Sequence, residues 1–234
     1  MTTRNHFTNP EIERRVENLL ARMSLSEKIG QTNQNHSFDI SQGEAIRQGN
    51  IGSILNASGA LTGQGQSPSA KAEVCNEIQR IAVQDSRHGI PILFGRDVIH
   101  GYRTVFPIPL GQAAAWHPEL VENAAAVAAS EATADGIKWT FAPMIDIARD
   151  PRWGRVAEGA GEDPFLGSAM AAAMVRGFQG PNFAAPDRLV ACAKHFVGYG
   201  AAEGGRDYDN AEISMRTLLD VYLPPYRSAS DKPG

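Results

Sequence analysis

The chain has 234 residues, of which 42% are hydrophobic, and its formal net charge is −4 with no dense run of Lys or Arg. This composition is typical of an ordinary globular domain and lacks the basic surface of a protein that binds nucleic acid or an acidic membrane. No stretch is long and apolar enough for a transmembrane helix, so we expect neither nucleic acid nor a membrane as a partner.

The start of the chain and its cysteines bear on compartment and cofactors. The first residues, MTTRNHFTNPEIERR, lack the apolar core of a secretory signal, which predicts a cytoplasmic location, or a periplasmic or secreted one if the start has been trimmed. Cys75 and Cys192 lie far apart without metal-ligand spacing, which favours buried free thiols. Because the histidines also lack short ligand spacing, we expect no metal and no cofactor.

The first part of the chain carries signals for two helices. Asn9 and Pro10 suit the cap and the first position of a helix, and Ser24 with Glu27 forms a capping box for the segment SLSEKIGQ. Along the first helix, apolar residues recur on one face at helical spacing: Ile12, Val16, Leu19, Leu20 and Met23.

Short apolar strands then alternate with helices. The predicted strands are Ile51–Leu55, Pro91–Phe94, Trp139–Ala142 and Leu189–Ala193. The predicted helices run from about Ser69 to Gln84, from Pro118 to just before Gly136, from Asp163-Pro164 to near Gly177, and from Ser214 to Tyr222. This alternation argues for parallel βαβ units whose strands are buried on both faces.

Two α/β architectures fit this order, an open doubly wound sheet and a (β/α)8 barrel. A nucleotide-binding open sheet usually carries a Gly-rich phosphate turn after a strand, and neither G-x-G-x-x-G nor a P-loop occurs here. In a barrel the loops after the strands carry the chemistry, and the polar clusters of this chain each follow a strand. We therefore expect a (β/α)8 TIM-barrel-like domain that is incomplete in this chain, since about four strand–helix units stand against the eight of a closed barrel.

Two polar clusters follow the second and third predicted strands. Asp97 in FGRDVIHG can accept hydrogen bonds from two vicinal sugar hydroxyls, although a loop Asp more often makes a local turn bond. The segment DIARDPRWGR, which ends at Arg155, predicts an ion-pair network that holds a loop rigid and leaves one arginine for a ligand. The carboxylates of EGAGED, from Glu158 to Asp163, could serve a glycosidase, but helix capping by Asp163 and neutralisation of the arginines fit better.

The last cluster is the pair Lys194-His195, directly after the fourth predicted strand. Because Lys is rarely buried unpaired, the pair is suited to donating hydrogen bonds to hydroxyl groups. A Schiff base formed by Lys194 is the alternative chemistry.

Taken together, these segments resemble glycoside hydrolase family 3, the family of β-glucosidases and β-xylosidases. The resemblance covers nearly the whole chain and rests on RDPRWGR, GED and KHF in this order, together with GIPILFGRDVIHG and YLPPYRSA. It implies that residues 1–234 are the N-terminal part of a (β/α)8-like domain, which in the family is followed by an α/β sandwich domain.

The resemblance also implies a retaining hydrolysis of β-linked glucosides or related oligosaccharides. Arg149, Asp150 and Arg152 would then support the loop. The family's sugar-binding residues fall on four positions of the matching motifs: Asp97, Arg155, Lys194 and His195.

The resemblance places no catalytic residue in this chain. The family's nucleophile is an aspartate in an S-D-W or S-D-H segment on a later strand, and its acid/base residue comes from further downstream. Asp231 in SASDKPG, the last aspartate here, follows no apolar strand. We therefore expect the isolated chain to be inactive.

Two other functions stay open on the sequence. The chain could be a non-catalytic sugar-binding module that uses the same four residues, or an aldolase-like enzyme with Lys194 as a Schiff-base nucleophile. A partial barrel also leaves a sheet edge and apolar faces uncovered. We therefore expect the chain to need either the missing C-terminal part of the same enzyme or a self-association partner.

Overall fold

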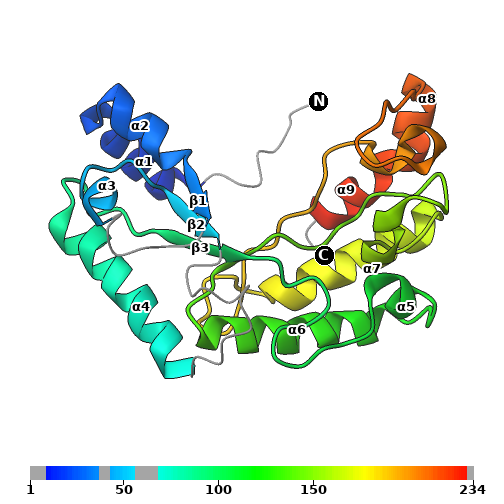
Figure 1. Cartoon of the computed structure of the whole chain (residues 1–234), viewed down its shortest axis with the longest axis horizontal. Coiled ribbons are helices and arrows are strands. Elements are labelled where there is room, and N and C mark those ends of the chain that lie inside the picture. The colour runs from blue at the N-terminus through cyan, green and yellow to red at the C-terminus, as the bar shows by residue number, and fades with distance from the viewer. Residues whose placement is uncertain (1–8, 37–42, 56–67, 231–234) are drawn as a thin grey trace. The chain divides into compact units, whose positions relative to one another are not determined.

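Figure 1 shows the computed structural model of the chain, which describes residues 9–36, 43–55 and 68–230. By its internal contacts the chain divides into two compact units, residues 1–94 and 95–234. The segment 1–8, which is part of the signal-peptide argument, and Asp231 lie outside the described residues.

The first unit begins with two helices whose predicted caps are confirmed. α1 spans Pro10–Arg22, and the side chain of Asn9 accepts a hydrogen bond at its start. α2 spans Leu25–Gln31, where Ser24 and Glu27 each accept a hydrogen bond from the other's backbone amide. These caps are local, so the sequence alone specifies them.

Two parallel strands and two further helices complete the first unit. Gln34 of β1 lies opposite Ser53 of β2, and the Leu93 amide donates to the Gly52 carbonyl beside β2. The bounds are Gln34–His36 for β1, Gly43–Arg47 for α3, Ser53–Leu55 for β2 and Pro68–Arg80 for α4, which continues as a π-helical turn over Ile81–Asp85. The predicted strand and helix of this region are thus confirmed, whereas β1 and α3 were missed because the short polar strand has no apolar pattern.

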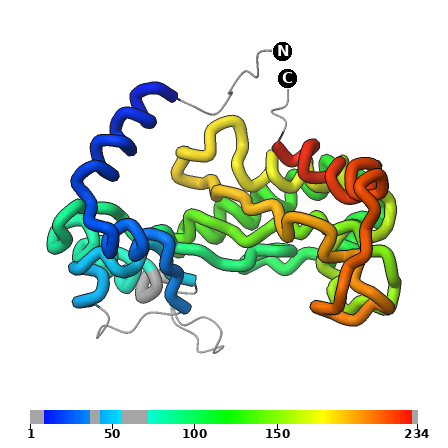
Figure 2. Tube along the Cα trace, turned by 90° about the horizontal axis from the view of Figure 1, so that it is seen from above, coloured from blue at the N-terminus to red at the C-terminus, as the bar shows by residue number. Residues whose placement is uncertain are grey.

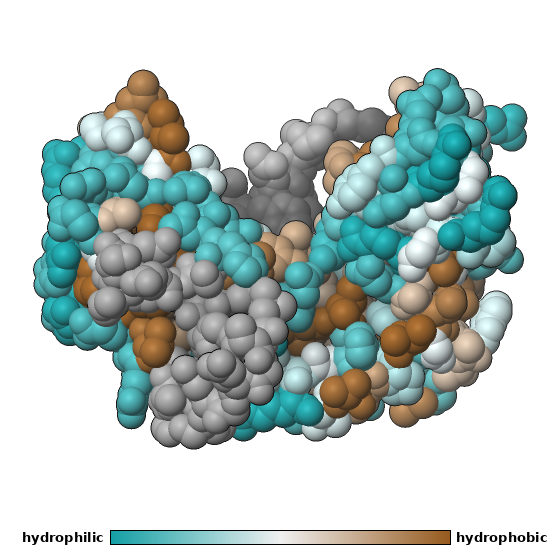
Figure 3. All heavy atoms as spheres, viewed as in Figure 1, coloured by the Kyte–Doolittle hydropathy of each residue, from teal (hydrophilic) through white to brown (hydrophobic). Residues whose placement is uncertain are grey.

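The apolar stripe of α1 stays exposed. Ile12, Val16 and Leu20 are 54%, 44% and 44% exposed, and no residue of α1 is buried. Figure 3 shows hydrophobic residues over α2, where Leu25 and Ile29 are also exposed. Such a stripe usually faces a core, but the core of the first unit comes from other residues, among them Ile46, Ile54, Ile78, Ile81 and Ile92.

The second unit also contains parallel strand pairing. β3 (Leu93–Arg96) enters this unit and pairs in parallel with β4 (Trp139–Thr140), with Gly95 opposite Trp139. A Cβ atom at Gly95 would lie 2.8 Å from the Phe141 ring, so glycine is needed for this close packing.

The predicted fourth strand, residues 189–193, is wrong as a regular strand. The segment still runs parallel to β4 and to the residues that follow β4, because Val190 bridges to Trp139 and Lys194 bridges to Met144. Between these two bridges lies Pro143, which has no N–H to donate and therefore interrupts the ladder. The result is an extended segment held by separate hydrogen bonds, including one from the Cys192 amide to the Ala142 carbonyl at 2.9 Å.

Helices cover these strands and position the loops. α6 (Pro118–Ala134) and α7 (Pro164–Gln179) pack against each other (Figures 1 and 2). The close approach of α6 and α7 depends on Gly177, where a Cβ would lie 2.2 Å from the Glu122 carbonyl oxygen. The remaining helices are α5 (Pro109–Ala113), α8 (Met215–Thr217) with a π-helical turn over Leu218–Tyr222, and α9 (Pro224–Ser230). The predicted helices of this unit are confirmed, and the strand–helix alternation confirms an α/β fold.

Candidate functional site

Two of the four predicted sugar-binding residues form an ion pair. Asp97 directly follows β3, and Lys194 directly follows the extended segment 189–193. The Lys194 Nζ donates to Asp97 Oδ1 at 2.6 Å, and the two side chains are 15% and 54% exposed. The half-exposed carboxylate can still accept hydrogen bonds from a ligand. Lys194 acts here as a hydrogen-bond donor, which is the role expected of a residue that binds hydroxyl groups.

His195 is held by a carboxylate that the sequence did not single out. Asp146 Oδ2 accepts a hydrogen bond from the His195 backbone amide and meets His195 Nδ1, both at 2.9 Å. Asp146 lies in the segment MIDIA, where apolar neighbours on both sides signal a buried position. Burial raises the pKa of Asp146, and the hydrogen bonds from His195 oppose that rise.

Arg155 is engaged by Glu158. Its Nε and Nη2 donate to the two Glu158 oxygens at 2.6 and 2.7 Å, and Nη1 lies 3.5 Å from the Tyr199 hydroxyl. These hydrogen bonds raise the pKa of Arg155 and lower that of Glu158. Glu158 therefore neutralises an arginine as predicted, and Asp163 accepts a hydrogen bond from the Leu166 amide as the predicted helix cap.

Tyr199 connects Arg155 to His195. Its ring lies edge-on to the His195 ring at 5.0 Å and 5.4 Å from Arg155 Cζ. The Tyr199 hydroxyl donates to Asp207 at 2.6 Å, and burial together with this hydrogen bond raises the pKa of Tyr199 to about 12. Arg155 and His195, two of the four predicted residues, thus meet at Tyr199, which could have been suspected only from its place in KHFVGYG.

Buried Trp153 anchors this cluster. Its Nε1 donates to Asp207 Oδ1 at 2.9 Å, and its ring meets Tyr199 edge-on at 5.1 Å. A Cβ at Gly200 would lie 2.2 Å from the Ile147 carbonyl oxygen, so only glycine allows the two loops to approach this closely. The loop of residues 146–158 and the loop of residues 195–209 therefore pack against each other as one unit.

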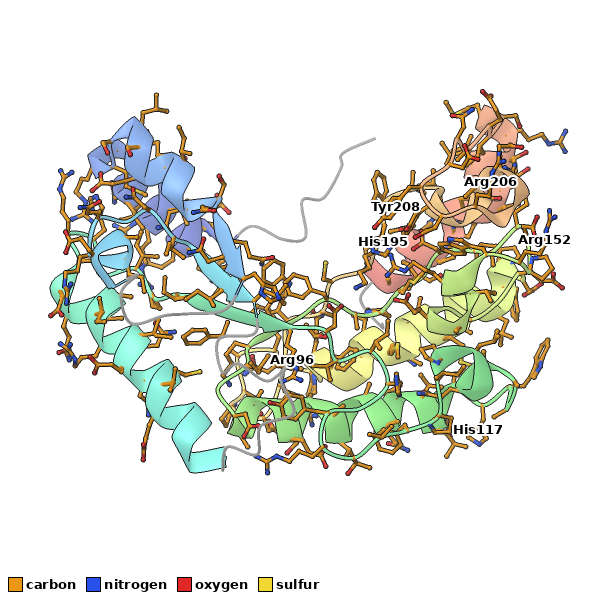
Figure 4. All side chains as sticks on the ribbon, viewed as in Figure 1. Arg96, His117, Arg152, His195, Arg206 and Tyr208 are labelled. Carbon is orange, nitrogen blue, oxygen red and sulfur yellow. The ribbon has the colours of Figure 1, made fainter. Side chains whose placement is uncertain are left out.

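The loop charges behave as the ion-pair interpretation predicted. Arg152 pairs with Asp150 at 2.6 Å, and Figure 4 shows Arg152 pointing outward. This pairing lowers the pKa of Asp150 to about 2. Arg149 bonds to the carbonyl groups of Ala201 and Glu212 and to the Glu203 carboxylate, so it ties the two loops together.

The remaining features concern metal ligands, a membrane span, the cysteines and a cleft away from the four predicted residues. Across residues 9–36, 43–55 and 68–230, no group of three His, Cys, Asp or Glu side chains could hold a metal ion, and no helix is long and apolar enough to cross a membrane. Cys75 is buried as predicted, whereas Cys192 is partly exposed. A cleft of about 380 Å³ between α5 and the start of α7 includes none of the four predicted residues.

Comparison with known proteins gives the family. The sequence profile described as the glycosyl hydrolase family 3 N-terminal domain matches residues 24–233. The periplasmic β-glucosidase of Salmonella typhimurium is 38% identical over 232 residues, which cover 97% of this chain and 29% of that protein.

Solved structures agree. A β-glucosidase from Listeria innocua in complex with isofagomine matches with a TM-score of 0.77 and 40% identity, over 93% of this chain and 30% of that one. An exo-1,3/1,4-β-glucanase from a Pseudoalteromonas species matches with a TM-score of 0.85 and 34% identity, over 94% and 29%. The chain spans about 30% of the length of these relatives and carries a TIM-barrel-like α/β fold. From the profile match, these relatives and the shared fold, we conclude that the chain belongs to glycosyl hydrolase family 3 and corresponds to its N-terminal domain.

Proposed function

We propose that this chain supplies the sugar-binding part of a retaining β-glucosidase-type glycoside hydrolase. The observation that carries the proposal is the ion pair of Lys194 with Asp97, next to His195, at loops that follow two parallel segments. A sugar hydroxyl both donates and accepts hydrogen bonds, so a lysine beside a carboxylate satisfies both roles. The residues assigned to the sugar are Asp97, Arg155, Lys194 and His195.

The proposal includes the architecture of the whole enzyme. Residues 1–234 would be the N-terminal part of the barrel domain, and the remaining strands and an α/β sandwich domain would come from further polypeptide. The relatives, of which the chain spans about 30%, support this arrangement. Retaining glycosidases use two carboxyl groups about 5 Å apart, one as nucleophile and one as acid/base, and we expect both on that further polypeptide.

A non-catalytic sugar-binding module is the second candidate, and one observation favours it for the isolated chain. Each site carboxylate that the structure describes already has a partner: Asp97 with Lys194, Glu158 with Arg155, and Asp146 with His195. A carboxylate held in this way is poorly suited to attack an anomeric carbon. We therefore propose that the chain alone binds sugar but does not cleave it.

The compartment stays a prediction. The cytoplasmic location expected from the first residues contrasts with the periplasmic β-glucosidase that is 38% identical to this chain. Fractionation of cells that express the protein would decide between the two.

The function is tested by titrating the chain with glucose in a calorimeter. We expect millimolar binding that Lys194→Ala and Asp97→Asn abolish. Arg152→Ala is the matched control, because this exposed arginine is paired with Asp150 and its loss should leave binding unchanged. No heat at millimolar glucose would count against sugar binding. Turnover of an aryl β-glucoside by the chain alone would contradict the expected inactivity.

A further inference from the structure

Asp146 is a carboxylate buried among apolar side chains. Its side chain is 1% exposed and borders a cavity of about 20 Å³ that Met144, Ile147 and Met170 also line. Oδ1 has no hydrogen-bond partner among the described residues, whereas Oδ2 serves His195 alone. Burying an ionisable group is costly unless it is paired, so packing does not explain a carboxylate here.

The backbone fixes the geometry of this pair. The Ile145 amide donates to the Lys194 carbonyl at 2.8 Å, and the Lys194 amide donates to the Pro143 carbonyl at 3.1 Å. These hydrogen bonds hold the two parallel segments side by side at Ile145 and Lys194, the residues directly before Asp146 and His195. The Asp146 carboxylate meets the Nδ1 side of the imidazole ring as a result.

Few other charged or titratable groups act on the pair. The charge of Arg155 acts on Asp146, His195 helps to lower the pKa of Glu158, and burial together with the charge of Asp146 raises the pKa of Tyr226. Tyr199 packs edge-on against the imidazole without a hydrogen bond to Asp146. Among the described residues, His195 is therefore the hydrogen-bond partner that Asp146 has.

The hydrogen-bond pattern determines which ring nitrogen carries the proton. A backbone N–H can only donate, and an ionised carboxylate can only accept. Because Oδ2 meets both the His195 amide and Nδ1, the Nδ1 atom must be protonated to form its bond. The other ring nitrogen, Nε2, is then an acceptor in the neutral imidazole.

We infer that Asp146 is a positioning residue, which holds the His195 ring, keeps its proton on Nδ1 and leaves Nε2 as an acceptor for a ligand hydroxyl. Only the identity of that ligand rests on the proposed function. Lys194 can only donate, so the neighbouring Lys194 and His195 would offer sugar hydroxyls one donor and one acceptor. The sequence had suggested two donors.

The first test reads the tautomer directly. We would record ¹⁵N NMR spectra of the chain with labelled histidine rings near pH 8, above the ordinary histidine pKa of about 6.5, and assign His195 by comparison with His195→Gln. The expected spectrum has a protonated Nδ1 and an unprotonated Nε2. A protonated Nε2 in the wild-type chain would overturn the inference, whatever the variants do.

The second test asks whether Asp146 causes this tautomer. Asp146→Asn should move the ring proton to Nε2, because the amide no longer demands a donor at Nδ1, and Asp146→Glu should keep it on Nδ1. Asp150→Asn is the matched control, since this carboxylate on the same loop pairs with Arg152 and its loss should leave His195 unchanged. A His195 that keeps its Nδ1 proton in folded Asp146→Asn would reduce Asp146 to a packing role.

The third test separates this inference from the proposed function. Titration with methyl β-glucoside should shift the His195 Nε2 signal, and Asp146→Asn should weaken the affinity roughly tenfold through one misdirected hydrogen bond. If the wild-type tautomer is as expected but glucoside leaves Nε2 unaffected, the positioning by Asp146 stands and the assignment of His195 to sugar falls.

Discussion

At the scale of single residues, the candidate site is built from ion pairs that differ in their exposure to water. The guanidinium groups differ most: Arg155 is 24% exposed and Arg152 is 74% exposed, whereas their partners Glu158 and Asp150 are 32% and 18% exposed. An exposed guanidinium adds little to stability through its ion pair, because water and salt screen its charge. A half-buried guanidinium that loses its carboxylate keeps its charge without compensation.

The first prediction follows from this difference. Glu158→Gln should lower the free energy of unfolding by about 1–3 kcal/mol, because Arg155 is left partly desolvated without its anion. Urea denaturation monitored by tryptophan fluorescence measures the change. Asp150→Asn serves as the control and should cost less than about 0.5 kcal/mol. Equal losses for the two variants would show that burial of the guanidinium does not matter.

A second residue-scale prediction concerns acid. The pKa of Glu27 is lowered from 4.5 to about 2, and hydrogen bonds from Ser24 are the largest cause of this shift. His88 and Arg87 lower it further. Because the folded-state pKa lies below the unfolded one, the stabilisation is complete above pH 4.5 and is lost as the pH falls toward 2.

Thermal unfolding of the chain between pH 7 and pH 2 measures this loss. Glu27→Gln should unfold at a lower temperature at pH 7 and show a weaker dependence on pH below about 4.5. Glu13→Gln, on the exposed side of α1, is the control and should keep the wild-type profile. An unchanged acid profile in Glu27→Gln would contradict the assignment of this carboxylate.

At the scale of elements, close approach of backbones sets the packing of α6 on α7. Gly177→Ala should destabilise the chain by about 1–3 kcal/mol, because the new Cβ would overlap the Glu122 carbonyl oxygen. Gly111→Ala in α5 is the matched control: its Cβ would meet nothing closer than 3.6 Å, so the better helix propensity of alanine should make it neutral or stabilising. Calorimetry of both variants decides, and a stable Gly177→Ala would refute the packing argument.

Elements that depend on local chemistry could be predicted from the sequence, and those that depend on distant partners could not. The caps at Asn9, Ser24 and Asp163 involve residues within a turn of one another. The strand predicted at residues 189–193 failed because Pro143, far away in the sequence, interrupts its partner. The place of Asp146 beside His195 likewise required the parallel pairing of Met144 with Lys194.

For the candidate site, the motifs indicated the four sugar-binding positions and the loop supports. They did not reveal that Tyr199 packs between Arg155 and His195, or that Asp207 joins Tyr199 to Trp153. Two of these contacts, Tyr199 with Arg155 and Asp207 with Trp153, link residues that are distant in the chain, and neither composition nor helical spacing contains that information.

At the scale of the whole molecule, exposed apolar side chains on α1 predict self-association. Exposed patches of this kind usually mark an interaction surface, so we expect the purified chain to form oligomers at micromolar concentration. Replacing Ile12, Val16 and Leu20 together by Gln, a good helix former, should shift the chain toward monomer in analytical ultracentrifugation.

The control for this prediction changes the same helix without touching its apolar stripe. Glu13→Gln with Glu17→Gln should leave the oligomers unchanged. A wild-type chain that sediments as a compact monomer would refute both this prediction and the need for a covering partner.

The joint between the two site loops also has a consequence for engineering. Trp153 from one loop shares Asp207 with Tyr199 from the other, and Gly200 lies against the Ile147 carbonyl. A designer who grafts only residues 146–158 from another family member would leave Tyr199 and Gly200 facing foreign neighbours. Residues 146–158 and 195–209 therefore form one transferable cassette, and chimaeras should exchange them together.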